Sequence, residues 1–203
     1  MTTNPGTTPC HGELPDWQRA VCEMRSHRGA TLEQLSADSP TLVVFLRHTG
    51  CVFCREALAD LSRQRATIEA AGARLVLVHM SDPLSATLRF ERYSLGDVHR
   101  YSDPKCVLYR AFGLPRGSFR QVLGAWVWWR GLIAAVLCGH GIGRLEGDGF
   151  RMPGVFLLDH GRIMAEHRAV SAADRPDYVD IARRGCVAAD RSRTRSDFPA
   201  PAA

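Results

Sequence analysis

The stretch that decides the fold is TLVVFLRHTGCVFCREALADLSRQRATIEAAGARLVLVHM, residues 41–80. It opens with a short, nearly continuous apolar run, Thr41 to Arg47, which is typical of a strand buried on both faces of a parallel sheet. From Cys54 to Ala71 apolar residues recur at helical spacing, and Gly72 provides a helix stop. Arg74 to Met80 repeats the strand pattern. The stretch therefore predicts a right-handed βαβ unit and a sheet that is at least partly parallel.

The flanking sequence adds shorter elements to this unit. Helices are expected at 16–27, 81–93, 106–112 and 173–184, and a further short element of unspecified type at 31–36. Strands are expected at 154–159 and 162–167, joined by His160-Gly161, a two-residue hairpin signal. These patterns predict the α/β class, with a central mixed sheet flanked by helices.

The length of 203 residues suits one domain with a single core. We expect a flexible N-terminus over 1–14, the domain over 15–186, and a disordered tail over 187–203, which has little apolar content. A Trp-rich insertion at about 115–149 precedes the late strands, and its apolar core falls short of the roughly 20 residues needed to cross a bilayer. We expect no stable membrane insertion. An inserted helix that packs on the domain, or on a second subunit in a homodimer, is favoured over an element that lies on a membrane surface.

The distribution of charge and the pattern of cysteines indicate which partners and which cellular compartment to expect. The net charge of +5 is spread along the chain and clusters only in the short tail 191–195, so no nucleic-acid partner is expected. The first 16 residues lack the basic start and apolar run of a signal peptide. Most of the seven cysteines stand singly, which favours a reducing compartment, so we expect a cytoplasmic protein.

Cys51 and Cys54 are the candidate catalytic residues. A Cys-x-x-Cys where a buried strand meets a helix places the first sulfur near unpaired helix N–H groups, which stabilise negative charge. In such sites the thiol pKa falls from about 8.5 to about 3.5–7.5, and Arg47, His48 and Arg55 would add positive field. The second thiol then attacks a mixed disulfide or sulfenic acid on the first. The spacing predicts a redox site in which Cys51 attacks and Cys54 resolves.

Other interpretations stay open at this point. The two cysteines would be inert if both were simply buried, or they would bind zinc with His48 and a further ligand, for which Cys138-Gly-His140 is the remote candidate. Cys106 would resolve a sulfenic acid if folded close, although a single cysteine at a helix start is more often structural. The redox interpretation is favoured, and no metal or other cofactor is expected.

The order strand, Cys-x-x-Cys, helix, strand, with a late Met152-Pro153 before GVFLLD, resembles the thioredoxin fold. Pro153 matches the cis-proline of that fold, and a cis bond before proline is a minority state that implies a specific structural demand. In the thioredoxin superfamily the cis-proline loop lies beside the cysteine pair and shapes the groove for the partner disulfide. The resemblance therefore implies that Thr49, Gly50, Met152 and Pro153 line a substrate or partner groove.

A closer resemblance covers about residues 31–184. FLRHTGCVFCRE, the LYRAFGL segment at 108–114, the Trp-rich insertion and MPGVFLLDHGRI are similar to the peroxiredoxin-like AhpC/TSA group that includes SelL-type redox proteins. This resemblance implies that Cys51 and Cys54 close an internal disulfide in antioxidant or thiol reduction. It also implies a protein disulfide or hydroperoxide as substrate and a thioredoxin- or glutathione-type dithiol as reductant.

The sequence departs from true peroxiredoxins at their main motif. They carry Pro-x-x-x-Thr/Ser-x-x-Cys, and counting back from Cys54 puts Cys51 at the Thr position and Arg47 at the Pro position. They also carry an arginine just before the late strand, where this chain has Pro153, with Arg151 two residues earlier. One alternative is a peroxidase with Cys54 as the peroxidatic residue, and another is a non-catalytic module that senses redox state or binds zinc.

Overall fold

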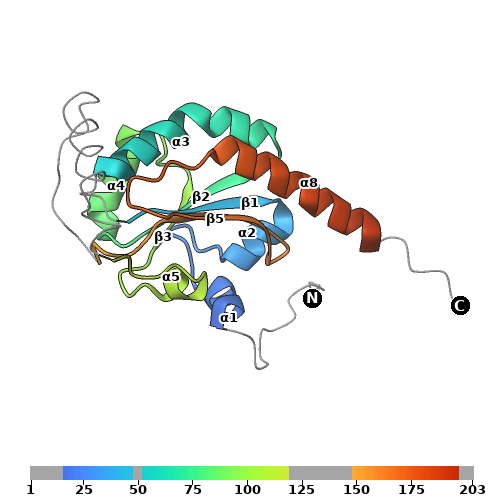
Figure 1. The fold of residues 1–203 in the computed structure, drawn as a ribbon, viewed down its shortest axis with the longest axis horizontal. Helices are drawn as coiled ribbons and strands as arrows, with labels where there is room; N and C mark the ends of the chain where they lie inside the picture. The colour runs from blue at the N-terminus through green and yellow to red at the C-terminus, as the bar shows by residue number, and fades with distance from the viewer. Residues whose placement is uncertain (1–15, 48–51, 119–147, 197–203) are drawn as a thin grey trace, which may run out of the picture.

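The computed structural model describes residues 16–47, 52–118 and 148–196 (Figure 1). Along the chain the elements are α1 (Asp16–Glu23), α2 (Leu32–Asp38), β1 (Thr41–Phe45), α3 (Val52–Ala70), β2 (Arg74–His79), α4 (Pro83–Arg92), β3 (His99–Ser102), α5 (Val107–Ala111), β4 (Gly154–Asp159), β5 (Arg162–Arg168) and α8 (Tyr178–Ser196). Within the described part, the strands form one sheet in the order β3-β2-β1-β4-β5.

The sheet is mixed, as the sequence predicts. β1 pairs in parallel with β2, and β2 with β3, whereas β4 runs antiparallel to both β1 and β5. The register is centred on Val43, which lies between Val76 of β2 and Phe156 of β4. All residues of β1 and β4 are buried, because helices cover both faces of the sheet.

Two apolar clusters, one on each side of the sheet, form the core. Leu42 and Val44 of β1 face a cluster that contains side chains from α3, α4 and α8. Val43 and Phe45 point the opposite way, toward α1, α2 and α5. Figure 1 shows the same layers, with α3 and α8 on one side of the sheet and α1 and α5 on the other. The period-2 alternation of a strand thus divides one apolar run between two helical layers.

The late hairpin follows the prediction. His160 and Gly161 both have positive φ, 47° and 70°, which is the backbone of a type I′ turn between two strands. Strand β3, in contrast, is not apparent from the sequence. It is only four residues long, His-Arg-Tyr-Ser, and lacks an apolar run, although Arg100 and Tyr101 are buried within it.

The C-terminal prediction needs correction, since residues 187–196 are helical rather than part of a disordered tail. Helix α8 begins at Tyr178, where Asp177 caps it by accepting a hydrogen bond from the Asp180 N–H (2.9 Å). It continues to Ser196 because its last turns still contact the sheet. Ala189 is 1% exposed, and Arg193 forms an ion pair with the buried Asp159. Residues 197–203 lie outside the described part.

The described residues on either side of 119–147 lie next to each other. The Gly117 N–H donates to the Phe150 carbonyl (2.7 Å), and the Met152 N–H donates to the Pro115 carbonyl (3.0 Å). The helix expected inside the insertion lies at 119–147, outside the described residues. In the part of the chain that the structure describes, none of the helices has the length and apolar character that crossing a membrane requires.

Candidate functional site

Cys54 is the third residue of α3, the helix that follows β1 in the chain. Its side chain is 5% exposed, and its sulfur accepts a hydrogen bond from the Arg47 N–H (N···S 3.2 Å). The first-turn N–H groups of a helix lack intrahelical acceptors and carry partial positive charge. A Cys54 thiolate, once its proton has been removed, would therefore have a hydrogen-bond donor and partial positive charge beside its sulfur.

The LYRAFGL segment holds the end of β1 that carries Arg47. In this segment Tyr109, fully buried, directs its hydroxyl at the carbonyl oxygens of Leu46 and Val78 (3.2 Å to Val78). Burial raises the pKa of Tyr109 well above its ordinary value, so the hydroxyl remains a donor. The buried Asp103 carboxylate orients α5 by accepting from the Leu108 N–H (2.7 Å). The segment therefore supports the peptide bond that contacts the Cys54 sulfur.

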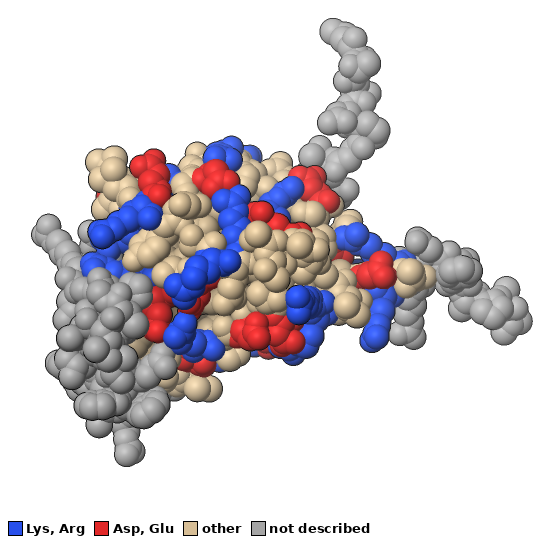
Figure 2. Space-filling view, turned by 90° about the horizontal axis from the view of Figure 1, so that it is seen from above, with Lys and Arg blue, Asp and Glu red and all other residues tan. Residues whose placement is uncertain are grey.

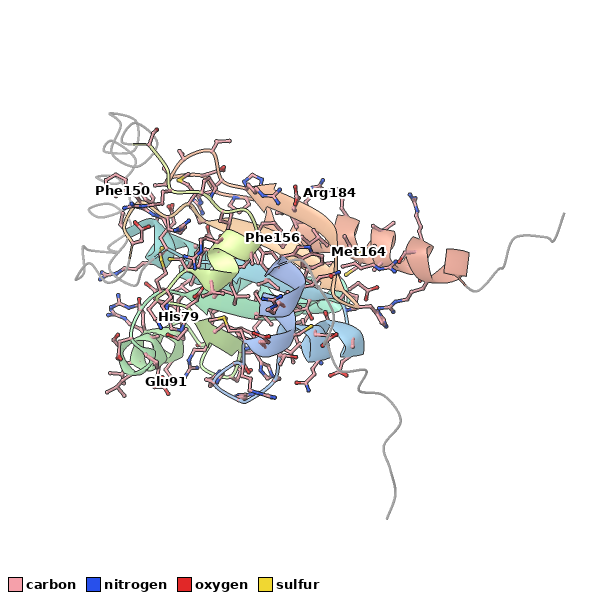
Figure 3. All side chains as sticks on the ribbon, turned by 90° about the horizontal axis from the view of Figure 1, so that it is seen from below. His79, Glu91, Phe150, Phe156, Met164 and Arg184 are labelled. Carbon is pink, nitrogen blue, oxygen red and sulfur yellow. The ribbon has the colours of Figure 1, made fainter. Side chains whose placement is uncertain are left out.

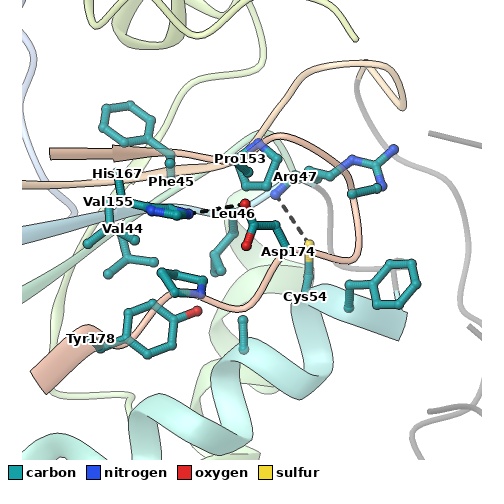
Figure 4. A pocket seen from close by; sticks show the side chains of 16 residues that line it. Val44, Phe45, Leu46, Arg47, Cys54, Pro153, Val155, His167, Asp174 and Tyr178 are labelled. Atoms are coloured by element: carbon teal, nitrogen blue, oxygen red, sulfur yellow. Dashed lines mark hydrogen bonds and ion pairs between the residues drawn. The ribbon is translucent and has the colours of Figure 1, made fainter. Parts of the chain in front are cut away.

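Cys54 lies in the wall of a pocket of about 40 Å³ between β1, β4, β5 and α3 (Figure 4). The polar and proline residues around it come from distant parts of the chain. Pro153 precedes β4, and His167 is the next-to-last residue of β5. Asp174 belongs to the loop that follows, and Tyr178 is the first residue of α8. The remaining lining side chains are mainly apolar. A water molecule needs about 10–15 Å³ by this measure, so the pocket accommodates water or a similarly small molecule.

His167 and Asp174 form a hydrogen-bonded pair in this wall. The imidazole Nε2 is 3.1 Å from the Asp174 Oδ2 atom, and the same oxygen accepts from the Val170 N–H (3.0 Å). The His167 side chain is 34% exposed and that of Asp174 is 18% exposed. The pair is thus partly shielded, with the carboxylate fixed by two donors.

A cluster of ion pairs, in which the carboxylates are buried, links the same loop to α3. Arg175 contacts Glu56 (2.8 Å) and Asp60, and Asp60 also contacts Arg63. Glu56 and Asp60 are buried on α3, two and six residues after Cys54. Tyr178 lies between this cluster and the pocket. Its burial, and then the negative charge of Asp60 and Cys54, raise the pKa of its hydroxyl, which therefore stays protonated at neutral pH.

The structure brings together part of the predicted site. Cys54 and Pro153 line one pocket, and Arg55 follows Cys54 on α3. Met152 is buried at 1% exposure and is absent from the described lining of this pocket. His48, Thr49, Gly50 and Cys51 lie outside the described residues, as do Cys138 and His140 of the zinc alternative. In the described ranges, no three His, Cys, Asp or Glu side chains group as metal ligands.

The expected cis bond before Pro153 is wrong. All peptide bonds of the described residues are trans, including the Met152–Pro153 bond. The backbone on both sides is held in an extended course, since the Met152 N–H donates to Pro115 and the Pro153 carbonyl accepts from the Ala169 N–H (3.2 Å). Pro153 reaches the Cys54 pocket from this extended segment.

Cys106 and Arg151 form a separate environment on the α5 side of the sheet. The Cys106 sulfur lies 3.3 Å from the Met80 sulfur, and burial raises the pKa of the Cys106 thiol. Arg151 donates to the Leu114 carbonyl (3.0 Å) and lies 3.7 Å from Asp148. Neither side chain is in the described lining of the Cys54 pocket. A resolving role for Cys106 stays a prediction, and its buried, protonated state disfavours it.

The described sheet, its helical layers and a cysteine at the start of the helix after the central strand define a thioredoxin-like fold. Residues 60–171, more than half of the chain, match the sequence model of a family described as AhpC/TSA antioxidant enzyme. The chain belongs to this peroxiredoxin-like family, as the resemblance predicts. The matched range begins after Cys54, so the assignment rests on the remainder of the fold rather than on the cysteine pair.

Individual relatives agree with this assignment. Human Peroxiredoxin-like 2A is 27% identical over 158 residues, which cover 73% of this chain and 64% of the human protein. The crystal structure of peroxidoxin BcpB from Mycobacterium tuberculosis has a TM-score of 0.54 at 16% identity, covering 81% of this chain and 90% of that one. A structure of Xanthomonas campestris Peroxiredoxin Q has a TM-score of 0.53 at 17% identity, covering 84% and 95%. The two structural likenesses show the fold.

Proposed function

We propose that this protein is a thiol oxidoreductase that cycles Cys51 and Cys54 between dithiol and disulfide in antioxidant or thiol reduction. The observation that carries the proposal is the environment of Cys54. Its sulfur lies in the first turn of α3, accepts the Arg47 N–H and borders a pocket with Pro153. Cys51 stands three positions earlier, just before the helix begins. Membership of the AhpC/TSA family supports a thiol redox role.

The proposed cycle assigns a different task to each sulfur. The Cys51 thiolate attacks one sulfur of a protein disulfide, forming a mixed disulfide and releasing the other sulfur as a thiolate. With a hydroperoxide it attacks the terminal oxygen instead, forming a sulfenic acid and releasing an alkoxide that takes up a proton. Cys54 then attacks the Cys51 sulfur, closes the internal disulfide and expels the partner thiolate or hydroxide. A thioredoxin- or glutathione-type thiol restores the dithiol.

The burial of Cys54 supports these separate roles for the two sulfurs. Cys54 is 5% exposed, so a protein disulfide has poor access to it, whereas attack on a sulfur three positions away in the same chain needs no such access. The second candidate function is a peroxidase in which Cys54 reacts first. The small pocket beside Cys54 favours that candidate, because about 40 Å³ suits a small oxidant far better than a protein.

One oxidation experiment tests both candidates. The purified protein is treated with one equivalent of hydrogen peroxide, and its disulfides are mapped by mass spectrometry beside Cys51→Ser and Cys54→Ser variants. Arg47 and Arg55 bracket the pair, so the tryptic peptide 48–55 contains both cysteines and no other. A Cys51–Cys54 disulfide that re-forms through repeated cycles of a thiol reductant supports the proposal.

The variants identify the nucleophile. Sulfenic acid retained in Cys54→Ser marks Cys51 as the attacking residue, whereas sulfenic acid retained in Cys51→Ser supports the Cys54 peroxidase. One oxidation without turnover would indicate a redox sensor. If both thiols stayed reduced, or if zinc co-purified in equimolar amount, the enzymatic proposal would be abandoned.

A further inference from the structure

We infer that His167 and Asp174 form a proton relay for Cys54, in which His167 takes the Cys54 proton as the disulfide closes and Asp174 positions His167. The inference rests on the proposed function and extends it to two residues outside the Cys-x-x-Cys motif. His167 and Asp174 come from the end of β5 and the following loop, and they line the same pocket as Cys54 (Figure 4).

The chemistry of disulfide closure requires such a group. Only a thiolate attacks a disulfide efficiently, and an ordinary thiol with a pKa of about 8.5 is mostly protonated at neutral pH. Cys54 is buried, so its proton has little access to bulk water. A base in the wall of the pocket provides a route that does not require the site to open.

Apart from Arg47, the described lining of the pocket contains four side chains that exchange protons, namely Cys54, His167, Asp174 and Tyr178. Burial raises the pKa of Tyr178, so this hydroxyl is a donor and not a base at neutral pH. The Arg47 guanidinium donates to the Gly149 carbonyl. Glu56 and Asp60, on the neighbouring turns of α3, are engaged by Arg175. Among the described residues around the pocket, this leaves the His167–Asp174 pair to accept the proton.

Hydrogen bonds fix the arrangement of the pair in the pocket wall. When the Nε2–H of His167 donates to Asp174 (3.1 Å), the lone pair of the neutral imidazole is on Nδ1, which is the nitrogen that takes a proton. The carboxylate also compensates the positive charge that the imidazole then acquires. Because the Val170 N–H donates to the same carboxylate oxygen (3.0 Å), the orienting group is itself fixed.

The loop that carries Asp174 is held from two sides. Asp174 contacts β5 through His167, and the next residue, Arg175, contacts α3 through Glu56 and Asp60. Adjacent residues therefore fix this loop between the strand that carries the base and the helix that carries Cys54. The pocket between them has room for a water molecule, which would conduct the proton from the sulfur to the imidazole.

The step balances without an additional reactant. The Cys54 proton passes to Nδ1 of His167, and the Cys54 sulfur attacks the Cys51 sulfur of the mixed disulfide. The new Cys51–Cys54 bond forms as the bond from Cys51 to the partner sulfur breaks, and the partner leaves as a thiolate. His167 then returns the proton to that thiolate. The dithiol is oxidised, the partner is reduced, and the relay ends in its starting state.

The test measures closure separately from attack. Full-length reduced protein is mixed with glutathione disulfide, quenched with acid at intervals and blocked with N-ethylmaleimide. Mass spectrometry of peptide 48–55 then gives the fractions of the Cys51–glutathione adduct and of the Cys51–Cys54 disulfide. His167→Gln and Asp174→Asn should slow conversion of the adduct to the disulfide about tenfold to hundredfold at pH 7, as expected for loss of a general base. Adduct formation should change less than about twofold.

The pH profile distinguishes a relay from a structural role. The deficit of both variants should disappear by about pH 9.5, where an ordinary thiol ionises unaided. A deficit of equal size at every pH would overturn the inference, as would closure at the wild-type rate. His160→Gln is the matched control, since His160 forms another His–Asp contact (3.3 Å to Asp159) at the opposite end of β5 and should close normally. If Asp174→Asn fails to fold, the partly exposed His167→Gln variant decides.

The outcome also separates this inference from the function on which it depends. Wild-type protein that forms no Cys51–Cys54 disulfide would refute the proposed function itself. Wild-type protein that closes normally, with variants that close equally fast, would refute only the relay.

Discussion

The hydroxyl of Tyr109, in the LYRAFGL segment, contacts the backbone where β1 ends, close to Cys54. It contacts the carbonyl oxygens of Leu46 and Val78, and both the tyrosine and these strand residues are buried. Tyr109→Phe removes the donor and leaves the ring in place. We expect a loss of about 1–2 kcal/mol in the free energy of unfolding, because a buried carbonyl loses its hydrogen-bond partner. Urea unfolding at pH 7 measures the change.

The pH dependence of the Tyr109→Phe effect checks that a lost hydrogen bond causes the loss of stability. Since burial keeps the pKa of Tyr109 well above its ordinary value, the loss should be the same at pH 7 and pH 9. Tyr93→Phe, at a partly exposed position beside the core, should change stability by less than about 0.5 kcal/mol. A Tyr109→Phe protein as stable as the wild type would show that the hydroxyl contact has no net effect.

Residue-level prediction from the sequence is strongest where chemistry is local. A motif and its order along the chain point to Cys54 and Pro153, which line one pocket, although the expected cis bond before Pro153 is trans. The sequence did not point to His167, Asp174 and Arg175. The first two join the lining of the Cys54 pocket, and Arg175 reaches Glu56, only when the loop after β5 folds back toward α3. A histidine at the end of a strand followed by Asp-Arg is too common a pattern to indicate a pocket.

At the scale of elements, the close approach of α8 to β4 depends on one glycine. A Cβ atom at Gly185 would lie 2.8 Å from Cβ and 2.5 Å from Cδ2 of Leu157. Gly185→Ala should therefore destabilise the protein, although alanine is favoured over glycine in helices by about 1 kcal/mol. Overpacking costs about 1–3 kcal/mol, so we expect a net loss of about 1–2 kcal/mol in urea unfolding.

The neighbouring position supplies the control for Gly185. Arg184 is exposed and pairs with Asp180 one turn earlier, and Arg184→Ala should change stability by less than about 0.5 kcal/mol. If Gly185→Ala stabilised the protein, helix propensity would outweigh the contact, and α8 would have to shift from β4 at little cost.

How well each helix or strand could be predicted depends on how much of its stability comes from its own sequence rather than from contacts in the folded domain. β1, α3 and β2 were predicted nearly to their ends, because each combines a strong apolar pattern with a clear stop. The continuation of α8 to Ser196 was not, since Ala189 and Arg193 gain contacts only against the folded sheet. β3 escaped prediction for the same reason, as its short polar sequence becomes a strand through pairing with β2.

At the scale of the whole molecule, charged groups decide how stability depends on pH. Figure 2 shows basic and acidic side chains interspersed over the face that carries α3 and α8, where Arg65 contacts Asp97 and Glu69. Exposed pairs of this kind each contribute little to stability. The pH dependence of folding should therefore be dominated by buried groups, of which His79 is the clearest.

His79, at the end of β2 and packed edge-on against Phe90 of α4, is 2% exposed (Figure 3). Burial, followed by repulsion from Arg100, lowers its pKa from 6.5 to about 4. Between these values the unfolded chain binds a proton that the folded protein does not, so stability falls as the pH falls from 6.5 toward 4. The difference corresponds to about 3 kcal/mol at most. Urea unfolding between pH 8 and pH 4.5 measures this slope.

His79→Gln removes the titrating group, so the variant should lose stability less steeply below pH 6.5, whatever its stability at pH 7. A residual slope of the same sign is expected, because burial also lowers the pKa values of His27 and His99. Above pH 7 the imidazole is neutral in both folded and unfolded chains, and the two proteins should then show equal slopes. Equal slopes throughout the acidic range would mean that folded His79 accepts a proton as readily as the unfolded chain, through an opening of α4 away from β2.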